Sequence, residues 1–138
     1  NNPLYLKTEE TYNTHFVNWE EYARKPERFL CEYYTTFETI SPIGKYSPGC
    51  LTGMKILDLG CGNGDLSIEC LRFGAEYVIG VDLAENQVIR ARQIARDAGF
   101  SEDHYLFLKG NVYQSETVYD VLPLDEYGEK VDVALLAW

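Results

Sequence analysis

From Met54 onward, short apolar runs alternate with segments whose apolar residues recur at helical spacing. The runs are typical of strands buried on both faces, and they cover residues 54–60, 77–83, 105–111 and 130–138. The intervening segments predict helices over residues 65–74, 84–100 and 112–122. Consecutive parallel strands need a long connection, so strands that alternate with helices indicate crossover units. The pattern therefore predicts an α/β fold of three layers, with a parallel sheet between helices on both faces.

The first 53 residues differ in character, because aromatic side chains are frequent there. Two amphipathic helices are predicted at roughly 14–24 and 27–39, and Pro26 separates them because proline disfavours helical geometry in the residue before it. Residues 41–53 contain two prolines and three glycines and are typical of a connector. We therefore expect residues 1–53 to form a helical lid segment with its connector, and residues 54–138 to form the main domain.

The composition excludes some partners. The chain of 138 residues carries a net charge of −10, with 12 Lys and Arg against 22 Asp and Glu. A nucleic-acid partner is disfavoured, because binding a phosphate backbone requires clustered cations. The basic residues Arg90, Arg92 and Arg96 recur at helical spacing, which predicts a solvated helix face.

The four cysteines include no CxxC pair, so neither a metal site nor a redox site is predicted, and buried reduced thiols are expected instead. The sequence shows neither a secretory leader nor an apolar run of about 20 residues, the length of a membrane span. We therefore expect a protein of the reducing cytoplasm with no membrane partner.

The stretch GCGNGD, residues 60–65, directly follows the first predicted strand. A turn this poor in side chains lets a ligand approach the backbone closely. The dinucleotide fingerprint G-x-G-x-x-G/A requires glycine or alanine at position 65, where this chain has aspartate. Asp65 lies at the helix N-terminus where a pyrophosphate would bind, and Asp58 adds a second negative charge. The turn therefore favours a positively charged ligand without phosphates.

Two further polar residues end predicted strands. Asp82 ends the second strand, 22 residues after Gly60, where a carboxylate can accept hydrogen bonds from both hydroxyls of a ribose. Asn111 ends the third strand, and its amide could face the edge of an adenine ring. In a parallel sheet the ligand lies outside the carboxyl ends of the strands, so these residues predict an adenosine-type cofactor.

These segments resemble the motifs of class I S-adenosylmethionine-dependent methyltransferases. The stretch DLGCGNG, residues 58–64, is similar to their D-x-G-x-G-x-G first motif. The second motif, the third motif and the fourth strand of the family resemble VIGVDLAE, FLKGNV and KVDVALLAW. The resemblance covers residues 54–138 and implies a Rossmann-like sheet with strand order 3-2-1-4. It also implies S-adenosylmethionine as the methyl donor, and we expect a small molecule as the methyl acceptor.

The resemblance implies a set of cofactor-binding residues, which are Asp58, Gly60, Cys61, Gly62, Asn63, Gly64, Asp82, Leu83, Asn111, Val112 and Ala137. In the first motif, Gly60 and Gly62 would let the backbone approach the methionine part of the cofactor, and Asp58 would help hold its ammonium group.

The other members of this set would bind the nucleoside and the reacting centre. Asp82 would bind the ribose and Leu83 would pack on the adenine. Asn111 and the Val112 backbone N–H would bind the adenine edge, and Ala137 would lie near the sulfonium. No catalytic residue is predicted, because the sulfonium is already activated and alignment of the reacting atoms supplies most of the catalysis.

The chain departs from the family pattern in two ways. Asn111 replaces the usual aspartate, which predicts a weaker contact with the adenine. The family's sheet has seven strands, whereas this sequence reaches Trp138 at the end of the fourth. We therefore expect the C-terminal half of the domain in the same or another chain, and little activity without it.

Two alternatives remain at this point. The first is a non-catalytic S-adenosylmethionine-binding half-domain that acts as a scaffold or partner subunit. The second is a nicotinamide oxidoreductase, which Asp65 and the glycine spacing disfavour.

Overall fold

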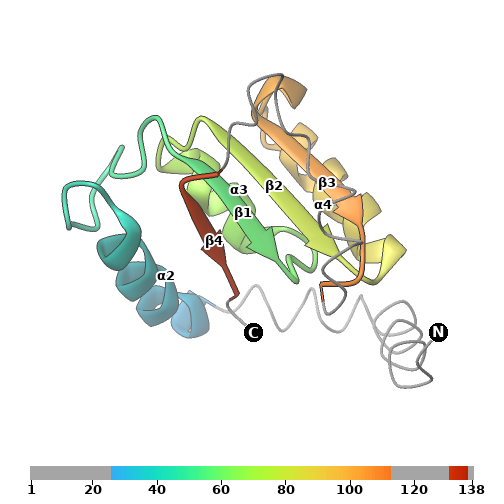
Figure 1. Cartoon of the computed structure of the whole chain (residues 1–138), viewed down its shortest axis with the longest axis horizontal. Helices are drawn as coiled ribbons and strands as arrows, with labels where there is room; N and C mark the ends of the chain where they lie inside the picture. The colour runs from blue at the N-terminus through green and yellow to red at the C-terminus, as the bar shows by residue number, and fades with distance from the viewer. Residues whose placement is uncertain (1–25, 113–130, 137–138) are drawn as a thin grey trace.

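The computed structural model describes residues 26–112 and 131–136. Within them, four parallel strands form one sheet in the order β3-β2-β1-β4. The strands are β1 (Lys55–Leu59), β2 (Tyr77–Asp82), β3 (Tyr105–Lys109) and β4 (Val133–Leu135). The helices are α2 (Pro26–Ile40), α3 (Asp65–Arg72) and α4 (Glu85–Asp97), with a 3-10 turn at Glu102–His104. The parallel sheet and its strand order confirm the Rossmann-like α/β prediction (Figure 1).

The strand residues alternate between two apolar clusters, one on each face of the sheet. The larger cluster includes Ile56 and Val78 from the strands, Leu66 from α3 and Ala91 from α4, so both helices cover the same face (Figure 1). The smaller cluster, on the opposite face, contains Leu57, Ile79 and Val81. The helix predicted at 112–122, which would lie in the next crossover, falls outside the described residues.

Helix α2 matches the predicted helix at 27–39 to within one residue at each end. Its Phe37 has no exposed surface and meets the ring of Phe73 edge-on at 5.0 Å between centroids. Phe37 belongs to the same cluster as Ile56 of β1, so part of the N-terminal segment shares the core of the sheet. The helix predicted at 14–24 lies outside the described residues.

Strand β4 is shorter than the predicted strand at 130–138. It pairs with β1 over three residues. Two hydrogen bonds of 2.8 Å, both between Lys55 and Asp132, hold the segment just before β4 against the start of β1. In these bonds the Lys55 N–H donates to the Asp132 carboxylate and the Asp132 N–H donates to the Lys55 carbonyl. Ala134 is exposed and Leu136, just beyond the strand, is 69% exposed. Both residues belong to the part of the chain around β4, the strand that ends the order of described strands opposite β3.

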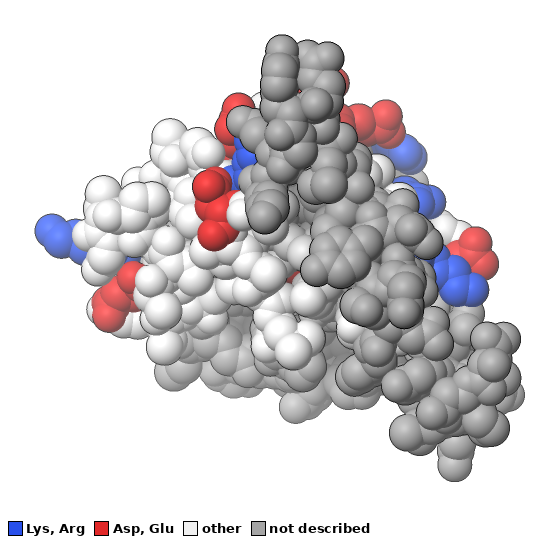
Figure 2. Space-filling model, in the orientation of Figure 1, with Lys and Arg blue, Asp and Glu red and all other residues white. Residues whose placement is uncertain are grey.

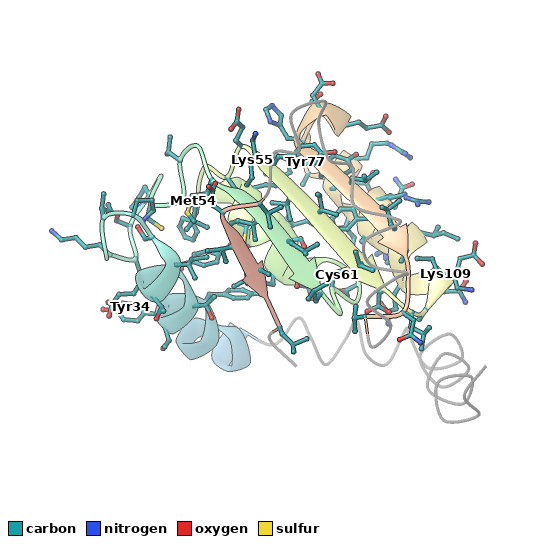
Figure 3. All side chains as sticks on the ribbon, in the orientation of Figure 1. Tyr34, Met54, Lys55, Cys61, Tyr77 and Lys109 are labelled. Carbon is teal, nitrogen blue, oxygen red and sulfur yellow. The ribbon has the colours of Figure 1, made fainter. Side chains whose placement is uncertain are left out.

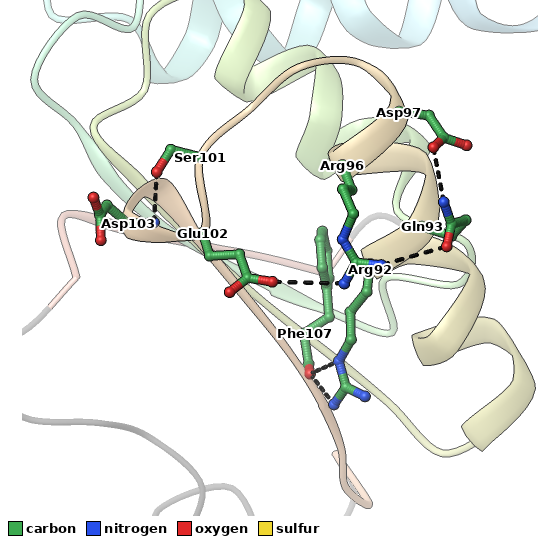
Figure 4. Close-up of polar contacts among 8 residues, drawn as sticks. All are labelled: Arg92, Gln93, Arg96, Asp97, Ser101, Glu102, Asp103 and Phe107. Atoms are coloured by element: carbon green, nitrogen blue, oxygen red, sulfur yellow. Dashed lines mark hydrogen bonds and ion pairs between the residues drawn. The ribbon is translucent and has the colours of Figure 1, made fainter.

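The basic face of α4 has a structural role at the end of the sheet (Figure 4). The Arg92 guanidinium donates two hydrogen bonds, of 3.1 and 2.7 Å, to the carbonyl of Phe107 in β3. Arg96 forms an ion pair of 3.5 Å with Glu102. Because β3 ends the order of described strands, Arg92 satisfies a carbonyl that would otherwise stay unpaired at a sheet edge.

Candidate cofactor site at the carboxyl edge of the sheet

The carboxyl ends of β1, β2 and β3 meet at one edge of the sheet, because the strands are parallel. Figure 3 shows Cys61 and Lys109 at this edge, whereas Lys55 and Tyr77 lie at the opposite one. The turn from β1 into α3, the turn from β2 into α4 and the end of β3 are therefore neighbours. In an open α/β sheet this edge is where ligands bind.

The glycines of the β1–α3 turn have two different roles. Gly60, Gly62 and Gly64 all have positive φ, at 73°, 57° and 84°, a region that other residues rarely adopt. A Cβ placed on Gly60 or Gly62 would meet nothing within 4 Å, so the space beside these two residues is open. A Cβ on Gly64 would lie 3.0 Å from that of Ala91, so Gly64 permits close packing of the turn against α4.

The side chain of Asp82 joins the two turns. One carboxylate oxygen accepts a hydrogen bond of 2.9 Å from the Gly62 N–H, and the other accepts one of 2.9 Å from the Ala84 N–H. Burial raises the pKa of Asp82, while hydrogen bonds from the backbone of Ala84, Gly62 and Leu83 act in the opposite direction. Each carboxylate oxygen has further lone-pair capacity, so Asp82 can still accept hydrogen bonds from a ligand.

The segment that follows β3 is hydrogen-bonded to the backbone of Asp82 and so lies beside the same two turns. The Gly110 N–H donates a hydrogen bond of 2.9 Å to the backbone carbonyl of Asp82. Asn111 and Val112 follow directly and are half-buried. The structure thus brings the predicted residues of the first three motifs together, whereas Ala137 lies outside the described residues.

Asp58 has a different environment from the one that the sequence suggested. Its side chain is 1% exposed, and one oxygen accepts a hydrogen bond of 2.6 Å from the Ser67 hydroxyl. Burial raises the pKa of Asp58 to about 7; the Ser67 hydrogen bond opposes the rise and the charge of Asp82 adds to it. Asp58 is therefore only partly ionised near neutral pH, which corrects the expectation of a full second negative charge beside the turn.

The N-termini of α3 and α4 both lie at this edge of the sheet. Asp65 is the first residue of α3, as predicted, and neither α3 nor α4 has a side-chain hydrogen bond at its N-cap.

Within the described ranges, no cluster of three or more His, Cys, Asp or Glu is arranged to hold a metal ion. None of the described helices has both the length and the apolar character that crossing a membrane requires.

Two polar residues near the turn were not anticipated from the sequence. Ser67 is fully buried and donates to Asp58. Gln87, in the first turn of α4, is 3% exposed, and its Oε1 atom has no hydrogen-bond donor among the described residues. Gln87 lies four residues before Ala91, on the helix face that packs against the glycine turn. No local pattern distinguishes either residue from an exposed helical Ser or Gln.

The described residues on the face shown in Figure 2 form no basic patch. On the side shown in Figure 2, the described Lys and Arg side chains lie at the periphery, interspersed with Asp and Glu. The described surface between them is largely uncharged.

Comparisons with known proteins agree with the geometry. A family model described as a methyltransferase domain matches residues 51–136. The chain is 30% identical over 93 residues to the ribosomal protein L11 methyltransferase of Lachnospira eligens, a match that covers 67% of this chain and 28% of that protein. The chain thus spans under a third of the length of this relative.

Solved structures show the same fold. The magnesium protoporphyrin IX methyltransferase of Synechocystis with bound SAH has a TM-score of 0.55 at 24% identity, over 79% of this chain and 52% of that one. The Trypanosoma brucei PRMT1 enzyme-prozyme complex with AdoHcy has a TM-score of 0.50 at 30% identity, over 75% of this chain and 28% of that one.

Proposed function

We propose, from the premise that the chain belongs to the class I S-adenosylmethionine-dependent methyltransferase family, that it binds S-adenosylmethionine at the carboxyl edge of its sheet. We propose further that the whole protein transfers the methyl group of this cofactor to an acceptor. The observation that supports the proposal best is the junction at Asp82. Its carboxylate joins the glycine turn to the start of α4, beside the open space at Gly60 and Gly62.

The residues at this edge fit an adenosine-type cofactor that lacks phosphates. A pyrophosphate at the start of α3 would lie beside the Asp65 carboxylate and be repelled by it. The open side of Gly60 and Gly62 leaves room for a ligand close to the backbone. The adenosine of S-adenosylmethionine matches the ribose-binding position of Asp82, and its sulfonium and ammonium groups suit an acidic site.

The proposed roles follow this placement. Residues 60–64 lie along the methionine part of the cofactor, with Asp58 directed to its ammonium group. Asp82 accepts hydrogen bonds from the ribose, and Leu83 packs on the adenine. Asn111 and the Val112 backbone N–H bind the adenine edge. Ala137 remains a proposed neighbour of the sulfonium on the strength of the resemblance alone.

The chemistry requires alignment more than acid–base groups. S-adenosylmethionine supplies a methyl group that is activated by its bond to a sulfonium. The chain's part is to hold the cofactor so that acceptor, methyl carbon and sulfur lie in line, which lowers the entropic cost of the reaction. We assign no general base among the described residues.

The class of acceptor is a separate proposal. The acidity of the chain favours a small molecule or a protein over a nucleic acid. We propose a small-molecule acceptor first. The similarity to a ribosomal protein L11 methyltransferase, whose name specifies a protein acceptor, favours a protein as the second candidate. Methyl-labelled S-adenosylmethionine, incubated with the whole protein and a cell extract, separates the two, because the label enters either the low-molecular-weight or the protein fraction.

Calorimetric titration tests the cofactor. We expect S-adenosylhomocysteine to bind in the micromolar range or tighter and NAD to bind at least tenfold more weakly, because Asp65 repels phosphates. Asp65→Ala should reduce the difference in affinity between S-adenosylhomocysteine and NAD. Asp97→Ala, at the far end of α4, should leave this difference in affinity unchanged. Tighter binding of NAD than of S-adenosylhomocysteine would contradict the proposal.

A further inference from the structure

The carboxyl group of Asp58 is buried, and no cation among the described residues compensates its charge. The side chain is 1% exposed, its Oδ2 atom accepts from the neutral hydroxyl of Ser67, and its Oδ1 atom has no donor among the described residues. An isolated buried charge is costly, so such a group either stays protonated or pairs with a cation. Asp58 lies near the carboxyl end of β1, two residues before Gly60 and the turn where the proposed cofactor binds.

The titratable and polar groups around Asp58 on the described elements are acids or neutral groups, and β4 places the apolar Leu135 beside it. Asp82 ends β2, Cys61 begins the glycine turn, and α3 contributes Ser67 and Cys70. From α2, Tyr33 feels the charge of Asp58 together with those of Asp65 and Glu69. No described Lys, Arg or His contributes to the pKa shift of Asp58. The cation that would stabilise its charged form is therefore absent from this set of residues.

We propose, on the basis of the proposed function, that Asp58 selects the cofactor by exchanging its proton for the cofactor's ammonium group. In the free protein at pH 6, the carboxyl group of Asp58 is mostly protonated. When the ammonium group reaches the turn, the O–H bond of Asp58 breaks, the proton passes to solvent and a carboxylate–ammonium pair forms. The net change is the uptake of one ligand cation and the release of one proton, so the charge of the buried site is balanced in both states.

The sign of the pH dependence follows from this exchange. Because the free pKa of Asp58 is about 7 and the ammonium group lowers the pKa in the complex, affinity rises with pH below neutrality and levels off above it. With full ionisation in the complex, binding at pH 6 releases about 0.9 proton, and affinity falls about fivefold between pH 7 and pH 6. A ligand without the ammonium group gains nothing from the ionised carboxylate.

The experiment measures S-adenosylhomocysteine binding by calorimetry at pH 6, in buffers of different ionisation enthalpy. The matched ligand is 5′-methylthioadenosine, which keeps the nucleoside and the thioether but lacks the amino acid group. We expect release of close to one proton with S-adenosylhomocysteine, and at least half a proton less with 5′-methylthioadenosine. This comparison uses the unaltered chain and so does not depend on whether a variant folds.

Asp58→Asn provides the second test, because asparagine keeps the shape but cannot ionise. The variant should bind S-adenosylhomocysteine without the proton release assigned to Asp58 and with a flat affinity between pH 6 and pH 7. Protons released by other groups, such as Asp82 or a histidine, would persist in the variant. Equal proton release with both ligands, or unchanged release in Asp58→Asn, would overturn the inference while leaving the proposed function intact. Failure of both ligands to bind would overturn both.

Discussion

Replacement of Asp82 by alanine tests the proposed cofactor site most directly. The carboxylate accepts hydrogen bonds from the N–H groups of Gly62 and Ala84, both at 2.9 Å, and in the complex we expect it also to accept from the ribose. A hydrogen bond to a charged group contributes about 1.5–3 kcal/mol. Asp82→Ala should therefore weaken S-adenosylhomocysteine binding by at least about tenfold, since 1.4 kcal/mol corresponds to a factor of ten.

The same substitution should lower the stability of the free protein. The backbone N–H groups of the two turns lose a charged acceptor, which predicts a loss of about 1–3 kcal/mol in the free energy of unfolding. Urea titration followed by circular dichroism measures this loss and also identifies conditions in which the variant is folded. Calorimetric titration under those conditions then separates the effect on binding from the effect on folding.

Two matched variants make the result interpretable. Asn111→Ala removes a neutral amide, whose hydrogen bond contributes about 0.5–1.5 kcal/mol, so its effect on binding should be smaller than that of Asp82→Ala. Asp97→Ala removes an acidic residue from the last turn of α4, where it accepts from Gln93, and should leave binding unchanged. A larger loss of affinity for Asn111→Ala than for Asp82→Ala would show that the ribose does not lie at Asp82.

Three further predictions concern the packing around the site. Gly64→Ala should lower the free energy of unfolding by about 2–4 kcal/mol, because φ is positive there and the added methyl would crowd α4. Gly99 also has positive φ but open surroundings, so Gly99→Ala should lower it by only about 1–2 kcal/mol. Urea denaturation measures both changes. Gln87→Met should raise the free energy of unfolding by about 1 kcal/mol, because it replaces a buried unpartnered carbonyl with an apolar group of similar size; a loss of stability would show that the amide is paired. Arg92→Lys should lower the free energy of unfolding by about 1 kcal/mol, because lysine cannot make both hydrogen bonds to the Phe107 carbonyl in β3. Arg96→Lys should change the free energy of unfolding by less than about 0.5 kcal/mol. Equal effects of the two substitutions in thermal unfolding would contradict this role for Arg92.

The sequence by itself determined the elements of the fold and the kind of edge at which the site lies. Buried strands and amphipathic helices have short periods, so β1, β2, β3, α3 and α4 were each predicted within a few residues. The glycine turn could also be predicted from the sequence. Positive φ at every second residue from 60 to 64 requires glycine at these positions, and such a run of glycines is rare by chance. Strand order came from the family resemblance, since hydrophobic periodicity carries no information on which strands pair.

The tertiary structure decided what each polar side chain does. Asp58 and Ser67 are nine residues apart and meet only because α3 folds back onto β1. Burial under α3 raises the pKa of Asp58, while the Ser67 hydrogen bond acts in the opposite direction. Asp82 reaches Gly62, and Arg92 reaches a carbonyl 15 residues away, through contacts between elements. Local sequence patterns reflect periodicity along one element, whereas the charge of a buried group depends on everything packed around it. For that reason the sequence identified the acidic residues of the site, and only the packing of α3 and α4 on the sheet determined their state of ionisation and their partners.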